Sequence, residues 1–213
     1  MPEHAIAPRT AAIRLEIFFD LACPFSLLAK LTIDNLLRTA TTPVAISWSP
    51  FILYPTLPAA GIDFHSAHVG KYGERALELQ RQVERRAAEL GVIIDHARIK
   101  KVPNTIDAHR AVRFAALAGR QGDMIEALLR AYFAEYRDLT DRDDLAAIVE
   151  SVGLPAAQFR RRLATDWTRS EVMAAHEESV RRGARSVPSY KLNGAHIENT
   201  TDVIAELQRR LTA

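Results

Sequence analysis

The residue of this sequence best suited to nucleophilic chemistry is its single cysteine, Cys23. It follows an alternating, β-branched and aromatic stretch, residues 13–19, that predicts a strand. It precedes Pro24, which suits the first turn of a helix. A thiol at the start of a helix faces unpaired backbone N–H groups and the positive end of the helix dipole, and both favour the thiolate. We therefore expect a reactive thiol whose pKa lies below its ordinary value of about 8.5, rather than a buried, inert cysteine.

A second position with special chemistry is Pro188, which begins a predicted strand near the C-terminal end of the chain. Proline begins strands only at sheet edges or where the geometry is unusual. A cis peptide bond between Val187 and Pro188 would present the Val187 backbone to a ligand lying along it. Most X-Pro bonds are trans, so the pattern alone leaves this alternative open.

Other groupings of reactive side chains carry less information. Asp63, His65 and His68 lie close together in the sequence, but no further ligand cluster accompanies them, and we expect no metal site. The sequence contains neither a glycine-rich phosphate loop nor a Gly-x-Ser-x-Gly elbow.

The elements that must position Cys23 and Pro188 fall into three segments, which we assign to residues 13–62, 63–165 and 166–213. The first segment predicts a strand, a helix and a parallel strand, the second is helical throughout, and the third returns to helix, hairpin and helix. Asn193-Gly194 is the strongest hairpin signal in the chain. The predicted fold class is α/β, with a large all-helical insertion between two halves that form one sheet. The elements expected in the outer segments are 13–19, 24–38, 44–48, 166–182, 188–192, 195–198 and 201–211.

These features resemble the DsbA-like branch of the thioredoxin superfamily, and within it the FrnE-type dithiol-disulfide isomerases. Related members are the 2-hydroxychromene-2-carboxylate isomerases and the kappa-class glutathione transferases. The resemblance implies a thioredoxin fold interrupted by a helical domain, with Val187–Pro188 in the cis form opposite Cys23. It extends from about Ile13 to Leu211 and is carried by FDLACPFS (19–26), WSPFILYP (48–55), KYG (71–73), PNTIDAHR (103–110) and SVP (186–188).

The resemblance also implies a set of site residues. Cys23 and Ser26 would be catalytic, and the residues in contact with substrate or glutathione would be Pro24, Phe25, Asn104, Thr105, His109, Val187 and Pro188. For three of these an alternative stays open, since Asn104 and Thr105 could simply cap the helix that begins there. His109 could have a packing role instead of contacting substrate.

The sequence departs from the FrnE pattern at Ser26, where those proteins usually have a second cysteine. Without a resolving thiol, Cys23 can still form a mixed disulfide, but an external thiol must resolve it. Monothiol exchange or disulfide isomerisation is therefore expected, and net oxidation by the protein alone is not. A hydrogen bond from Ser26 to the thiolate would lower the pKa of Cys23 further.

Two further functions remain open at this point. The isomerase and transferase relatives have Ser at the position of Cys23 and hold glutathione as thiolate, so a glutathione-dependent isomerase or transferase acting on a small aromatic electrophile is one alternative. In the transferases a Ser-Asp pair at the last helix holds glutathione, and Asn199-Thr200-Thr201-Asp202 matches that pair poorly. The other alternative is a non-catalytic thioredoxin-fold binding protein.

The composition of the chain limits which partners the protein can bind and which cellular compartment suits it. The 213 residues carry 28 Lys and Arg against 26 Asp and Glu, a net charge of +2 that provides no strong field for nucleic acid or an anionic membrane. A lone cysteine forms no intramolecular disulfide, and no apolar run suggests a signal peptide or membrane span. We expect a cytoplasmic protein without a tightly bound cofactor, with glutathione as a candidate co-substrate. Small thiols, protein disulfides or a small aromatic substrate are the expected partners, and the resemblance is compatible with a homodimer.

Overall fold

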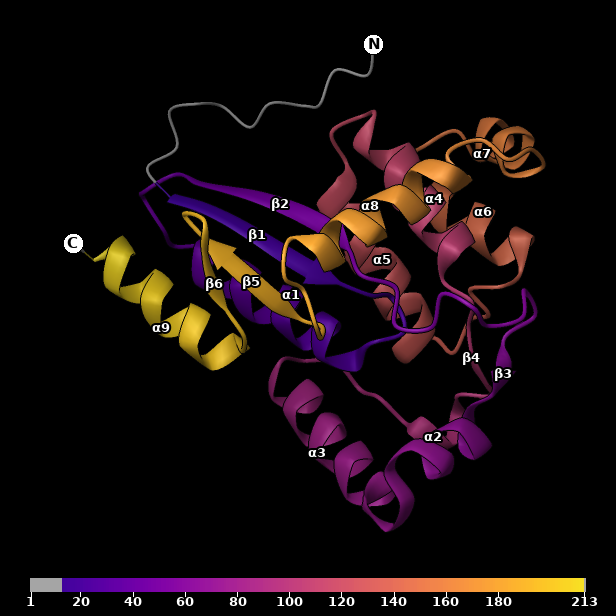
Figure 1. Ribbon diagram of the computed structural model, residues 1–213, viewed down its shortest axis with the longest axis horizontal. Helices are drawn as coiled ribbons and strands as arrows, with labels where there is room; N and C mark the ends of the chain where they lie inside the picture. The colour runs from indigo at the N-terminus through magenta and orange to yellow at the C-terminus, as the bar shows by residue number, and fades with distance from the viewer. Residues whose placement is uncertain (1–12, 213) are drawn as a thin grey trace.

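The protein, described here by a computed structural model covering residues 13–212, is built around a four-stranded sheet with strand order β2-β1-β5-β6. The strands are β1 (Ile13–Phe19), β2 (Val44–Pro50), β5 (Ser189–Leu192) and β6 (Ala195–Ile197). β1 runs parallel to β2 and antiparallel to β5, and β6 is antiparallel to β5. The two ends of the chain therefore form one sheet with a large insertion between them, which confirms the predicted thioredoxin fold (Figure 1).

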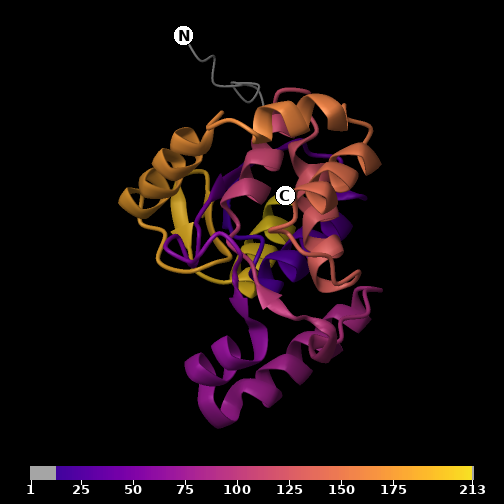
Figure 2. The same cartoon turned by 90° about the vertical axis from the view of Figure 1, so that its right-hand side faces the viewer.

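Helices cover both faces of this sheet. α8 (Arg169–Arg181) packs against β2, while α1 (Pro24–Leu37) contacts α9 (Thr200–Leu211). Figure 2 shows α8 on one side of the sheet and α1 with α9 on the other. The connection between β5 and β6 is the predicted hairpin, in which Asn193 and Gly194 have φ values of 50° and 91°. Positive φ at both positions is the requirement of a tight two-residue turn and explains the Asn-Gly pair.

The insertion has two parts. The helices α4 (Ile106–Ala116), α5 (Gln121–Phe133), α6 (Arg142–Ser151) and α7 (Ala156–Leu163) pack together beside the sheet. The other two, α2 (Phe64–Tyr72) and α3 (Ala76–Glu89), form an arm that extends away from the rest of the molecule (Figures 1 and 2). Short 3-10 turns at 73–75 and 96–98 complete this region.

A second, very small sheet lies at the base of the arm. β3 (Ile62–Asp63) pairs antiparallel with β4 (Lys101–Val102), where the chain enters and leaves the arm. The insertion is therefore helical except for this pair. The sequence pattern does not predict it, because strands of two residues have no detectable periodicity.

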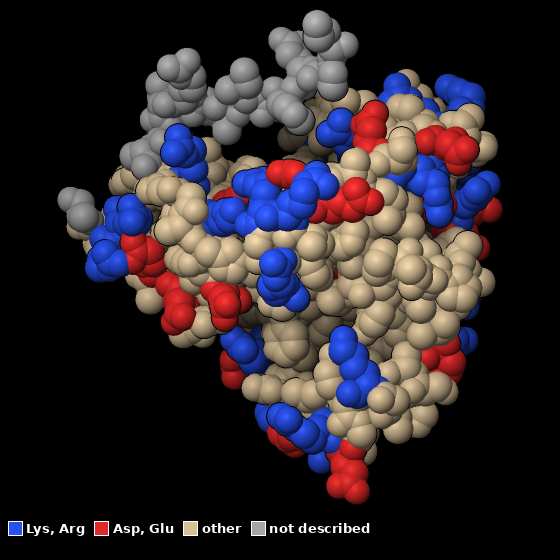
Figure 3. Space-filling model, in the orientation of Figure 1, with Lys and Arg blue, Asp and Glu red and all other residues tan. Residues whose placement is uncertain are grey.

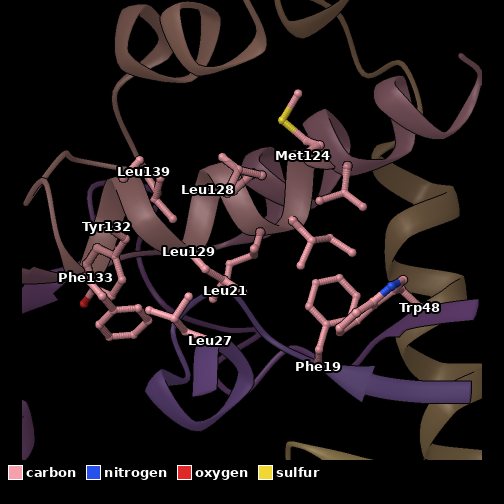
Figure 4. Packing of buried hydrophobic residues seen from close by; sticks show 14 of the residues in the cluster. Phe19, Leu21, Leu27, Trp48, Met124, Leu128, Leu129, Tyr132, Phe133 and Leu139 are labelled. Carbon is pink, nitrogen blue, oxygen red and sulfur yellow. The ribbon is translucent and has the colours of Figure 1, made fainter. Parts of the chain in front are cut away.

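The hydrophobic core joins the sheet to the inserted helices. Leu21 and Leu27, next to Cys23 in the sequence, pack with Leu128, Leu129 and Phe133 of α5 (Figure 4), and all five are fully buried or nearly so. This contact holds the segment around Cys23 against the insertion. Along the part of the chain that the structure describes, none of the helices combines the length and the apolar character needed to cross a membrane.

The helix α5 ends before its apolar pattern does. The apolar spacing extends α5 to Tyr136, but the helix ends at Phe133 and Tyr136 has a φ of 62°. The guanidinium of Arg98 lies 3.9 Å from the centre of the Tyr136 ring. The ring is therefore held by a cation–π contact outside the helix, which apolar spacing does not reveal.

Candidate active site

Cys23 is the N-cap residue of α1, as the sequence predicts. Its backbone N–H donates to the Asp20 carbonyl at 3.2 Å, and its carbonyl accepts from the Ser26 N–H at 3.0 Å. Pro24 occupies the first helical turn, where its missing N–H costs no hydrogen bond. The turn that ends β1 and the start of α1 together fix the position of the thiol.

The peptide bond between Val187 and Pro188 is cis, as the resemblance implies. β5 begins one residue later, and its pairing with β1 places Ser189 beside Phe18. This register brings the Val187 carbonyl to the N-terminus of α1, where it accepts a hydrogen bond from the Cys23 thiol at 3.3 Å. Two residues 164 positions apart in the sequence therefore meet at one point.

The expectation of a low thiol pKa is wrong. Cys23 is only 5% exposed, and this burial raises the pKa of its thiol to about 11. Hydrogen bonds from Ser26 and from the Phe25 backbone lower the pKa, and the nearby Asp20 carboxylate raises it. Removal from water outweighs the helix N-terminus here, so the resting sulfur is a protonated thiol that donates to Val187.

Ser26 lies directly beside the sulfur. Its side chain is fully buried, it hydrogen bonds to Cys23, and its Oγ accepts the Asp20 N–H at 3.4 Å. Pro24 and Phe25, the two residues between Cys23 and Ser26, are half-buried, and Phe25 packs against the core.

The Asn104–His109 string lies against the site from the insertion, but its polar atoms have protein partners. Asn104 donates to the Leu57 carbonyl at 2.7 Å and accepts the Ile106 N–H at 3.1 Å, so it braces the entry to α4. Thr105 and His109 are both buried and both hydrogen bond to Asp20, at 2.8 and 3.2 Å. Thr105 and His109 are therefore connected to the site by their hydrogen bonds to the Asp20 carboxylate.

Asp20 is the site residue that the sequence reasoning missed. It is 1% exposed, and its other carboxylate oxygen accepts the Leu53 N–H at 2.7 Å. One side chain thus joins the end of β1, the loop after β2 and the start of α4. The available signal was an acidic residue directly after a buried strand, a position where burial demands polar partners.

A cleft lies close to the site, at His109. The cleft has a volume of about 670 Å³ and runs between β2, α4 and α8, with Trp48, His109 and Val172 among its lining residues. Cys23 does not line it. Within residues 13–212, no group of three His, Cys, Asp or Glu side chains is arranged to hold a metal ion.

Charges around the site are balanced locally. On the face shown in Figure 3, Lys and Arg side chains are interspersed with Asp and Glu. Arg182 pairs with Glu16 of β1, and Arg113 of α4 pairs with Glu171 of α8 at 2.9 Å. At the base of the arm, Lys71 donates to the Tyr54 hydroxyl at 3.0 Å.

Comparisons with known proteins show a family to which the chain belongs and several proteins that it resembles. A family model described as a DSBA-like thioredoxin domain matches residues 14–211. A probable DsbA oxidoreductase from Streptomyces coelicolor is 25% identical, with a TM-score of 0.84 over 93% of this chain and 89% of that one. The protein YwbO of Bacillus subtilis strain 168, which is itself uncharacterized, is 26% identical over 78% of this chain and 82% of its own.

Two more distant structures share the fold. A 2-hydroxychromene-2-carboxylate isomerase is 16% identical, with a TM-score of 0.68 over 93% of this chain and 96% of that one. The cytosolic disulfide reductase DsbM from Pseudomonas aeruginosa, solved with glutathione, is 17% identical, with a TM-score of 0.63 over 94% of this chain and all of that one. At this identity the likeness concerns the fold alone.

Proposed function

Since the chain belongs to the DSBA-like thioredoxin domain family, we propose that it catalyses thiol–disulfide exchange through Cys23 as its single nucleophile. The observation that carries this proposal is the contact between the Cys23 sulfur and the Val187 carbonyl, 3.3 Å apart, beside the cis Pro188. A substrate strand lying along Val187 would bring its disulfide directly to the sulfur.

The first step forms a mixed disulfide. The Cys23 thiolate attacks one sulfur of a disulfide R–S–S–R′, so the Cys23–S–S–R bond forms and the R–S–S–R′ bond breaks. R′S⁻ leaves with the electron pair and takes up a proton. Because Ser26 occupies the position of a resolving cysteine, this intermediate persists until another thiol arrives.

The second step needs an external thiol, and we propose glutathione or a substrate thiol in this role. Its thiolate attacks the sulfur of R in the mixed disulfide, forms a new disulfide with R and releases Cys23. The protein returns to its starting state, and only the substrate and the external thiol change oxidation state. The chemistry is therefore reduction or isomerisation of disulfides, not net oxidation by the protein alone.

The buried thiol gives this cycle a built-in dependence on substrate. At rest the Val187 carbonyl accepts the thiol proton, and a hydrogen bond to the neutral form of an acid favours that form. A substrate N–H that takes over the Val187 carbonyl removes this acceptor. We therefore propose that docking lowers the pKa of Cys23 from its resting value of about 11 and so generates the thiolate where it is used.

The remaining features of the proposal follow from the same chemistry. We place the protein in the reducing cytoplasm, where external thiols are abundant. Its partners would be small thiols and protein disulfides, it would need no tightly bound cofactor, and it could work as a monomer or as a homodimer.

The competing function is a glutathione-dependent isomerase or transferase for a small aromatic substrate. This function would require residues at the start of α9 that are free to bind glutathione. There the Asn199 side chain is occupied by the N–H and the carboxylate of Asp202, at 2.9 and 2.7 Å, and the Thr200 hydroxyl is bound to that of Tyr190 at 2.7 Å. These internal bonds favour the exchange function.

The test is intact-mass measurement after incubation with oxidised glutathione. The wild type should gain one glutathione, reduced glutathione should remove it, and Cys23→Ser should gain none. A folded wild type that forms no adduct, while the urea-unfolded protein does, would contradict the proposal. Glutathione-dependent turnover of an aromatic electrophile that survives Cys23→Ser would favour the competing function.

A further inference from the structure

The carboxylate of Asp20 is almost completely buried. Oδ1 accepts from the Thr105 hydroxyl at 2.8 Å and lies 3.2 Å from His109 Nε2, and Oδ2 accepts from the Leu53 N–H at 2.7 Å. These partners come from α4, its N-cap and the loop after β2. Each carboxylate oxygen therefore accepts a hydrogen bond from a fixed donor, which suits an ionised carboxylate.

This carboxylate belongs to the same turn as the nucleophile. The Asp20 carbonyl accepts the Cys23 N–H at 3.2 Å, and the Asp20 N–H donates to Ser26 Oγ at 3.4 Å, while Ser26 also hydrogen bonds to the Cys23 sulfur. Asp20 and Cys23 are both almost fully buried. A negative charge in a poorly solvated turn opposes the formation of a second one beside it.

Two other titratable groups feel this charge without cancelling it. The Asp20 charge acts on His176 of α8 and on Tyr132 of α5, and burial lowers the pKa of the His176 ring and raises that of the Tyr132 hydroxyl. Both are therefore neutral near pH 7. His109 contacts the carboxylate directly, through Nε2.

From this geometry we propose that Asp20 is a positioning residue that holds the proton on the Cys23 sulfur at rest, and that Thr105 and His109 fix its carboxylate in that place. Asp20 touches no substrate in this scheme and acts through the sulfur. The PNTIDAHR string is then tied to the active site by Asp20 rather than by substrate contact. The proposal deepens the exchange function, since it explains how the nucleophile is kept inactive until a disulfide docks.

The experiment is the rate of iodoacetamide alkylation of Cys23 against pH. Asp20→Asn keeps the size of the side chain and removes its charge, and its inflection should lie about one pH unit lower than in the wild type, so that alkylation at pH 8 becomes about tenfold faster. Thr105→Val removes one hydrogen bond and keeps the charge, so its inflection should stay closer to that of the wild type than the Asp20→Asn inflection does. An Asp20→Asn inflection at or above that of the wild type would overturn the proposal.

A second measurement applies if Asp20→Asn does not fold. The chain has one cysteine, so ¹³Cβ-cysteine labelling yields a single resonance that reports Cys23 in the wild type. In protein that also carries ¹³Cγ-labelled aspartate, the Asp20 carboxyl carbon should shift over the same pH range in which Cys23 ionises. An Asp20 resonance that is flat through the Cys23 titration would contradict the proposal. Neither readout requires exchange activity, so a failure here is distinguishable from a failure of the proposed function.

Discussion

At the scale of single residues, the decisive feature is that Cys23 is placed for attack but kept protonated. The helix N-terminus, Ser26 and the Phe25 backbone all favour the thiolate, yet burial and the Asp20 charge prevail and raise the pKa to about 11. Reactivity toward small reagents that make no hydrogen bond to the Val187 carbonyl should therefore be low at neutral pH. In the function that we propose, exchange depends on a substrate that displaces the hydrogen bond from Cys23 to Val187.

Replacing Ser26 by cysteine should turn a single-thiol site into a dithiol site. In Ser26→Cys, we expect an intramolecular disulfide with Cys23 under oxidising conditions, and oxidation of a dithiol peptide without added glutathione. The lost acceptor for the Asp20 N–H should lower the free energy of unfolding by about 1 kcal/mol. The new disulfide is measured by counting free thiols in Ser26→Cys, and the new activity by the rate of peptide oxidation.

Ser26→Ala is the matched control, because it loses the same hydroxyl without adding sulfur. It should show the stability loss and no oxidase activity. If Ser26→Cys keeps two free thiols under oxidising conditions, the two positions do not share a dithiol geometry, and the comparison with dithiol relatives fails.

Residue types and spacing allowed part of this site to be predicted. Cys23 at a helix N-terminus could be predicted from a strand pattern followed by proline, and the cis Val187–Pro188 bond followed from the family resemblance. The pKa of Cys23 could not, because it depends on how deeply the folded chain buries the sulfur. Asp20 was missed for the same reason, since its partners Thr105 and His109 lie 85 and 89 positions away.

At the scale of elements, one buried arginine joins α4 to the connection between α7 and α8. The Arg110 side chain is only 2% exposed, and it donates to the carbonyls of Arg162, Thr165 and Trp167 and to Asp107. Charged side chains on a helix are mostly exposed, so the sequence alone favours a surface position for Arg110, and the structure shows it buried. The carbonyls that follow a helix end need donors, and here a side chain from another helix supplies them.

Removing this arginine should therefore destabilise the fold strongly. Arg110→Met keeps most of the apolar stem but leaves Asp107 and buried carbonyls without their donor, and the free energy of unfolding should fall by about 3 kcal/mol or more. Urea unfolding measures it. Arg113→Met, one turn along α4, removes an exposed pair with Glu171 and should cost less than about 1 kcal/mol. Equal losses in the two variants would show that Arg110 has no special role.

Element prediction succeeded where periodicity and caps are strong. β1 was predicted with its observed bounds, and the two strands of the β5–β6 hairpin within one residue. The strands β3 and β4 were not predicted, because they form only by pairing with each other at the base of the arm. The early end of α5 was not predicted either, because the contact between Arg98 and Tyr136 joins residues that are far apart in the sequence.

At the scale of the whole molecule, the buried thiol links stability to alkaline pH. The pKa of Cys23 is about 11 in the folded protein, well above that of a free thiol. Between these values the folded state holds a proton that the unfolded state has lost, so the free energy of unfolding falls as pH rises. The full difference corresponds to about 2–3 kcal/mol.

This loss should be visible in unfolding curves from pH 8 to 11. Burial also raises the pKa of Tyr132 and Tyr190, so the wild type should lose more than the contribution of Cys23 alone. Cys23→Ser should lose about 2–3 kcal/mol less than the wild type over this range. Parallel curves for the two proteins would mean that the folded thiol has an ordinary pKa.

The two halves of the sheet were predictable because each carries strong local patterns, and the family resemblance supplied their assembly. The orientation of the α2–α3 arm was not, because it depends on the β3–β4 pair and the packing of α3 against α1. The assignment of residues 13–62, 63–165 and 166–213 to separate domains remains a prediction, since one continuous core joins all three segments.

The account depends most on Cys23 carrying the exchange reaction by itself. The most direct measurement is the release of a peptide thiol from a peptide–glutathione mixed disulfide, with reduced glutathione as the second thiol, by the wild type and by Cys23→Ser. We predict that the wild type accelerates release above the protein-free rate, that this acceleration requires reduced glutathione, and that Cys23→Ser stays at the protein-free rate. Equal rates for folded wild type and Cys23→Ser would contradict the account.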